Sequence, residues 1–195
     1  MKETNYVHVA EDLLNAVSNG WYHAPHEVLG AHVEDGRTTI RVLRRLADRV
    51  FIETADGRTE ATHEFNGIWR AVLDTPEVPD YRVTAVYGDV EDRGDDPYRF
   101  LPTVGELDLY LFSEGRHERL WEVLGSHVKT YPSELGDVTG VSFAVWAPNA
   151  KAVRRLQRLG RKPSRHAHAR LVGRVGDLHS RCFRRPKVQV RDPIQ

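Results

Sequence analysis

The sequence contains one cysteine, Cys182, and no hydrophobic run of the roughly 20 residues that a membrane-spanning helix needs. A single cysteine excludes a disulfide framework within the chain. The first residues, Met1 to Asn5, lead into no apolar stretch that resembles a signal peptide. We therefore expect a cytoplasmic protein without disulfides.

The formal net charge is zero, but the charges of the two signs are unevenly distributed. Residues 1–150 hold 14 Lys and Arg against 26 Asp and Glu, whereas residues 151–195 hold 14 against 2, which gives net charges of −12 and +12. Eleven of the basic residues after position 150 are arginines. Such a difference in composition indicates two parts of different character.

The region before residue 90 carries one helical pattern followed by several strand patterns. Apolar residues recur at helical spacing between Asn5 and Asn19, and Gly20 is a suitable helix stop. Short β-prone runs follow, separated by turn pairs such as Asp35-Gly36, Asp56-Gly57 and Asn66-Gly67, which favour the positive φ angles of tight hairpins. The expected strands cover residues 38–43, 49–53, 61–65, 68–72 and 81–87. This spacing predicts an antiparallel β-sandwich.

Two clusters invite a metal interpretation. His23, His26 and His32 lie close together, but no second group of ligand-type residues stands at a matching spacing, so we expect structural histidines. The acidic segment Glu91–Pro102 supplies carboxylates that suit calcium, yet it lacks the Asp-x-Asp-x-Asp-Gly rhythm of a calcium loop. A solvated turn is the preferred interpretation, and we expect no bound metal.

Farther along, a helix is predicted to begin near Ser113 and to end at Gly125, with Leu120, Trp121 and Leu124 on one face. The segment Gly140–Ala150 begins with a period of two that predicts a strand. Pro148 and Asn149 then favour a turn that ends it.

Several phrases together resemble the amino-terminal part of glycogen branching enzymes of the actinobacterial type, in the α-amylase superfamily. These phrases are Pro25–His32 (Pro-His-x-x-Leu-Gly-x-His), Asp96–Phe100, Gly105–Asp108, Gly115–His127 and Gly140–Ala150 (Gly-Val-x-Phe-x-Val-Trp-Ala-Pro-x-Ala). The resemblance covers roughly residues 20–153.

The resemblance implies an all-β fold: an immunoglobulin-like sandwich with short flanking helices, then the start of a second sandwich of the carbohydrate-binding-module type. We expect an amino-terminal helix in residues 1–20, the sandwich in 21–106, a linker helix and loop in 107–137 and the first strand of the second sandwich in 138–153. An arginine-rich tail that we expect to be disordered fills 154–195. Since this tail lacks strand patterning, Val141, Phe143 and Val145 are expected to keep exposed apolar faces.

From Arg154 onward the resemblance stops, and a reading-frame error is one explanation. In a frame moved forward by one nucleotide, Pro186–Arg191 can spell Pro-Lys-Tyr-Lys-Phe-Glu, which is typical of the family at that place. A genuine tail would have other roles. Its arginines favour binding to polyanions, but no recognition helix accompanies them. His166, His168, His179 and Cys182 have the chemistry of zinc ligands, but no strand or turn pattern around them would position them. A membrane-surface helix would need an apolar face that the tail lacks.

The resemblance also implies a function. Branching enzymes cut an α-1,4-glucan and rejoin the piece through an α-1,6 link during glycogen synthesis, and their catalytic carboxylates lie on a barrel beyond residue 153. We thus expect a non-catalytic fragment without cofactor, membrane or specific nucleic-acid partner, whose parent acts on α-glucan. The candidate sugar contacts are Trp21, Tyr22, Trp69 and Tyr87, because flat aromatic faces stack on sugar rings. The alternative is a free-standing module that binds glucan or partners and carries a basic, polyanion-binding tail.

Overall fold

The structure is a computed structural model that describes residues 7–22, 24–146, 153–154 and 170–171. The chain divides into two compact units, residues 1–100 with 131–138, and residues 101–130 with 139–195. Among the described residues, no helix combines the length and the apolar character needed to cross a membrane. The four candidate zinc ligands and nine of the eleven arginines of the tail lie outside the described residues.

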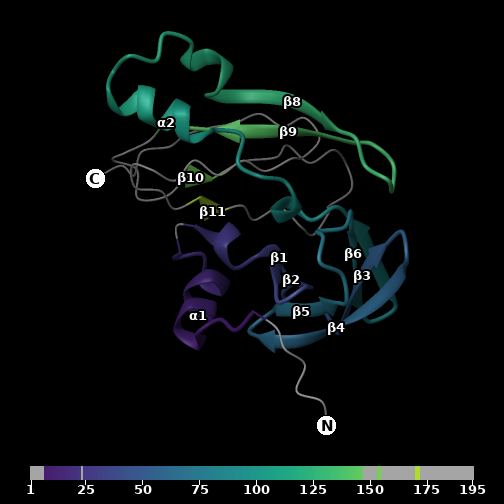
Figure 1. The fold of residues 1–195 in the computed structure, drawn as a ribbon. Coiled ribbons are helices and arrows are strands. Elements are labelled where there is room, and N and C mark those ends of the chain that lie inside the picture. The colour runs from purple at the N-terminus through teal and green to yellow at the C-terminus, as the bar shows by residue number, and fades with distance from the viewer. Residues whose placement is uncertain (1–6, 23, 147–152, 155–169, 172–195) are drawn as a thin grey trace. The chain divides into compact units, whose positions relative to one another are not determined.

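The first unit is mostly antiparallel β-structure, as the sequence predicts. Its strands are β1 (Gly30–Glu34), β2 (Arg37–Leu43), β3 (Arg49–Thr54), β4 (Gly57–Phe65), β5 (Ile68–Leu73), β6 (Arg82–Tyr87) and β7 (Val90–Gly94). They pair in the order β1-β2-β5-β4-β3-β6-β7 (Figure 1). Two 3-10 turns, Pro25–Glu27 and Pro97–Arg99, flank them.

The seven strands fold over at β4. The first half of β4 pairs with β3 and the second half with β5, and the register shifts between His63 and Phe65. In a flat sheet, β5 and β6 would lie three strands, or about 14 Å, apart. Instead, Trp69 of β5 and Val83 of β6 belong to one buried cluster, so the two halves face each other as the layers of a sandwich.

The predicted turns explain the hairpins. Asp35 and Gly36 have φ values of 50° and 74°, and Asn66 and Gly67 have 35° and 82°. Both pairs therefore adopt the left-handed conformation that two-residue hairpins require. In the third turn only Gly57 has a positive φ.

Helix α1 (Glu11–Asn19) confirms the predicted amphipathic helix. It covers the face of β5 that points away from the sandwich core. Leu14 and Val17 pack with Val28, Leu29 and Ile68 in a second buried cluster. Ile68 and Trp69 are neighbours in β5 and point to opposite faces. The same strand thus carries the helix on one side and the sandwich core on the other.

One segment of the first unit differs from its sequence interpretation. Residues 91–94, expected within a solvated acidic turn, belong to the edge strand β7 (Val90–Gly94), which pairs with β6. All five of its residues are exposed, and Glu91 and Arg93 form ion pairs with Arg58 and Glu53. Charged side chains on an edge strand discourage pairing with another chain, which accounts for a strand with so polar a sequence.

The second unit begins with helix α2 (Glu106–Ser113), and here the helix prediction was wrong. The helix ends at Ser113 instead of beginning there. Asp108 accepts a hydrogen bond from the backbone N–H of Gly105 and starts the helix, and Gly115 ends it at φ 65°. Leu120–Glu122 forms only a 3-10 turn, and Trp121 is 68% exposed rather than packed on a helix face.

Strand β8 (Gly125–Tyr131), which the sequence patterns did not indicate, pairs with β9 (Val138–Ala144). The strand expected at Gly140 thus exists but starts earlier and ends before Val145. Val141 and Phe143 are not left exposed as expected, because both are buried together with Ser142 and Ala144, and Val145 is half-buried. The chain covers both faces of this strand, which removes the cost of leaving its apolar surface in water. Strands β10 (Val153–Arg154) and β11 (Arg170–Leu171) form a further short pair.

Candidate functional site

The end of α1 presents an exposed aromatic side chain on a fixed backbone. Gly20 adopts φ 71°, its N–H donates to the carbonyl of Val17 at 3.0 Å, and the N–H of Trp21 donates to the carbonyl of Ala16 at 2.8 Å. These two bonds form a Schellman motif, which closes the helix and fixes the direction of the chain. The side chain of Trp21 is 63% exposed.

Tyr22 follows in a partly buried position against the cluster beneath α1. Its hydroxyl donates a short hydrogen bond to the carboxylate of Glu27. This hydrogen bond, then burial and the nearby negative charge, raise the pKa of Tyr22, so the phenol stays protonated and keeps donating. Trp21 and Tyr22 together combine an exposed ring with a polar tyrosine–carboxylate pair.

Trp69 lies in the sandwich core and is 8% exposed. Its indole N–H donates to the carbonyl of Arg44 at 3.0 Å, and His63 packs edge-on against its ring, with centroids 5.1 Å apart. These contacts give Trp69 a packing role and leave little of its surface for a sugar ring.

Tyr87 ends β6 and is half-buried against the same core. Burial raises the pKa of its phenol. Trp69 lies in the interior of the sandwich and Tyr87 packs half-buried against it, whereas Tyr22 packs beneath α1 on the opposite face of β5. The four candidate residues therefore do not share one surface.

The histidines near the start of the chain make structural contacts. His26 bonds through Nε2 to the carbonyl of Phe100 at 3.1 Å and stacks edge-on with Tyr98. His32 bonds to the carbonyl of Leu29, and burial lowers the pKa of its imidazole. His23 lies outside the described residues, and within the described part of the chain no three His, Cys, Asp or Glu side chains gather as metal ligands do.

The glycine of the Pro25–His32 phrase has a packing reason. Gly30 adopts φ 94°, and a β-carbon at this position would lie 2.6 Å from the carbonyl oxygen of Tyr98. Only glycine fits both the conformation and the close approach of the two backbones.

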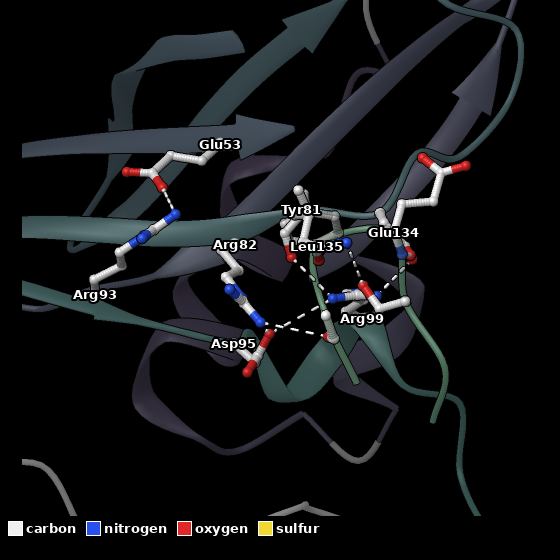
Figure 2. A network of polar contacts seen from close by, with 11 residues as sticks. Glu53, Tyr81, Arg82, Arg93, Asp95, Arg99, Glu134 and Leu135 are labelled. Atoms are coloured by element: carbon white, nitrogen blue, oxygen red, sulfur yellow. Dashed lines mark hydrogen bonds and ion pairs between the residues drawn. The ribbon is translucent and has the colours of Figure 1, made fainter. Parts of the chain in front are cut away.

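Two features of the structure have no signal in the sequence patterns. The first is a polar network around Arg99 that joins Asp80, Asp95 and the segment 133–136 (Figure 2). The second is an apolar pocket in the second unit, lined by Phe112, Leu120, Leu124 and Trp146 among others. The space that water can enter in it is about 10 Å³, room for about one water molecule.

Comparison with known proteins connects this geometry to a family. Residues 10–98 match the family described as alpha-1,4-glucan branching enzyme GlgB, N-terminal domain. A 1,4-alpha-glucan branching enzyme GlgB of Thermobifida fusca is 50% identical over 143 residues, which is 72% of this chain and 19% of the relative. A 1,4-alpha-glucan branching enzyme GlgB of Rhodococcus jostii is 43% identical over 164 residues, which is 84% of this chain and 22% of the relative.

Among solved structures, a pullulanase from Anoxybacillus complexed with maltotetraose is 21% identical, with 43% of this chain and 13% of that chain covered. The TM-score between the two is 0.35. The chain spans about a fifth of the length of the branching enzymes it matches. Through residues 10–98, the chain belongs to the family of the N-terminal domain of alpha-1,4-glucan branching enzyme GlgB.

Proposed function

We propose that this chain is the amino-terminal, non-catalytic part of a glycogen branching enzyme and that it binds α-glucan through the end of helix α1. The substrate class comes from the names of its relatives, 1,4-alpha-glucan branching enzymes. Cutting and rejoining of the glucan would belong to the rest of such an enzyme.

The observation that carries the binding proposal is the exposed ring of Trp21 on a backbone fixed by the Schellman motif. A flat indole supplies a large apolar face for a sugar ring. Because the backbone is already fixed, less conformational entropy is lost on binding. The carboxylate of Glu27, held by Tyr22, is placed to accept hydrogen bonds from sugar hydroxyls.

Affinity electrophoresis in gels that contain glycogen tests this proposal. Trp21→Ala should remove most of the retardation seen for the native chain, whereas Trp121→Ala, the replacement of a similarly exposed tryptophan in the other unit, should leave it unchanged. Equal retardation of the native chain and Trp21→Ala would refute the role of Trp21. No retardation of the native chain relative to an unrelated β-sandwich would refute glucan binding by this part.

The alternative function, a module with a polyanion-binding tail, is favoured by the 14 basic and 2 acidic residues after position 150. It predicts binding to heparin that weakens steeply as salt rises. Resequencing the gene across the codons for residues 150–195 comes first, because a restored frame would remove this tail from the protein.

A further inference from the structure

The segment Tyr131–Val138, here called the strap, joins β8 to β9 and packs in the first unit although residues 101–130 separate it from the sandwich in sequence. Both of its terminal residues are strand residues: Tyr131 ends β8 and Val138 begins β9.

Asp80 of the sandwich makes two hydrogen bonds to the strap. Its carboxylate accepts a hydrogen bond from the backbone N–H of Glu134 at 2.8 Å and another from the side chain of Ser133. It also pairs with the guanidinium of Arg99 at 2.5 Å. Although burial opposes ionisation, these three donors lower the pKa of Asp80, so the carboxylate is charged at neutral pH.

Arg99 holds the carboxylate of Asp80 in place through their ion pair. Its side chain is only 7% exposed, and it also donates to the carbonyl of Tyr81 at 3.2 Å and lies 3.6 Å from Asp95. Arg82 connects Asp95 to the carbonyl of Gly136 in the strap (Figure 2). Hydrogen bonds with an ionised partner are stronger than those between neutral groups. Removing one partner of a buried ion pair destabilises the protein, because the remaining charge is left buried without compensation.

Apolar contacts at the two ends of the strap offer another explanation of what holds it on the sandwich. The rings of Phe100 and Tyr131 lie 4.9 Å apart, and Val138 is buried. Between these ends, the amide of Glu134 and the carbonyl of Gly136 bond to side chains of the sandwich. The middle of the strap thus depends on polar contacts.

We propose that Asp80 and Arg99 form a latch that docks the strap on the sandwich, and that removing the carboxylate releases the strap while the sandwich stays folded. Without the Asp80 carboxylate, Arg99 would keep its ion pair with Asp95, and the amide of Glu134 would become free to exchange with solvent. This function of Asp80 is independent of glucan binding at Trp21.

Hydrogen exchange followed by mass spectrometry on the full chain tests the latch. Asp80→Ala should speed exchange of the peptide that contains residues 131–138 by about tenfold or more, the effect of losing one or more charge-assisted bonds. Exchange of peptides from β3 and β5 should stay at the native rate. Asp74→Ala, which removes an exposed aspartate–arginine pair elsewhere on the sandwich, should leave the strap unchanged.

Asp80→Asn distinguishes charge from shape, because the amide keeps one acceptor oxygen and almost the same volume. It should give an intermediate rate for the strap and retain native exchange in the sandwich. Native exchange of the strap in Asp80→Ala would overturn the proposal and leave the apolar ends as the anchor. Equal acceleration in the strap and in β3 would also overturn it, since Asp80 would then stabilise the sandwich as a whole.

Discussion

The two units bury their aromatic residues to different degrees. In the first unit, seven strands and one helix enclose Trp69 and Tyr81 between the sheet halves. In the described part of the second unit, Leu107, Tyr110 and Trp121 stay exposed and α2 contains no buried residue. The comparison teaches that the first unit encloses aromatic side chains between two sheet layers, whereas in the described part of the second unit burial is concentrated in β9 and leaves α2 and the turn after it exposed.

The largest effect is expected for Trp69→Ala, which opens a cavity in the closed core. Its free energy of unfolding should fall by about 3–5 kcal/mol. Trp121→Ala removes the same side chain from an exposed position and should change stability by less than about 0.5 kcal/mol. Urea denaturation followed by circular dichroism measures both, and similar losses would contradict the contrast between the enclosed Trp69 and the exposed Trp121.

A second large effect concerns the ion pair between Arg41 of β2 and Glu64 of β4. Glu64 bonds to Arg41, which is completely buried, at 2.7 Å and to Arg70 at 2.9 Å. Glu64→Ala would leave a buried guanidinium without a carboxylate and should cost about 3–5 kcal/mol.

The exposed pair of Arg37 and Asp74 is the matched control for Glu64→Ala. Asp74→Ala should cost at most about 1 kcal/mol because water and salt screen an exposed pair. Thermal denaturation of the two variants side by side is the measurement. If the two shifts were alike, burial would not govern the strength of these pairs.

Gly30→Ala should have an intermediate effect, about 1–3 kcal/mol, because alanine would adopt a positive φ and approach the carbonyl of Tyr98. Gly94→Ala is its control, since a β-carbon there meets no atom within 4 Å and the φ angle is not positive. A stable Gly30→Ala protein would mean that the backbone of residues 97–99 can move away.

The smallest expected effect is pH-dependent and lies in the second unit. The hydrogen bond from His117, then that from the N–H of Gly105, lowers the pKa of Asp108. A lowered carboxyl pKa contributes stability that is complete above the unfolded value near 3.9 and is lost as pH falls through the folded value.

Asp108→Asn should therefore cost about 0.5–1 kcal/mol at pH 7 and reduce the further loss of α2 on acidification to pH 3. Circular dichroism at the two pH values, compared with Glu114→Gln just beyond the end of the same helix, measures the difference. An equal acid response of Asp108→Asn and the native chain would show that this contact does not stabilise the helix.

The helix end was where local sequence interpretation failed. The Ser113 prediction treated a residue type that often begins helices as the start, but the Ser113 hydroxyl donates to the carbonyl of Tyr110 inside the helix that precedes it. Gly115 carried the stronger signal, since its N–H bonds to Phe112 and the next N–H bonds to Leu111 in the same motif that ends α1.

Of the four candidate sugar contacts, the sequence supplied residue types suited to stacking, and the structure distributes them among an exposed loop, a cluster beneath α1 and the sandwich core. Composition alone does not separate an exposed tryptophan from a buried one. Which face of β5 carries Trp69 follows from the register with β2 and β4, and register is a property of paired strands.

The sequence by itself determined the antiparallel class, the hairpin turns at Asp35-Gly36 and Asn66-Gly67, helix α1 and the family resemblance. These depend on contacts between near neighbours in the chain. The fold-over at β4, the burial of Trp69 and the Asp80–Arg99 latch were decided only by the tertiary structure. They join residues far apart in sequence, whose meeting depends on how the whole chain buries its apolar surface.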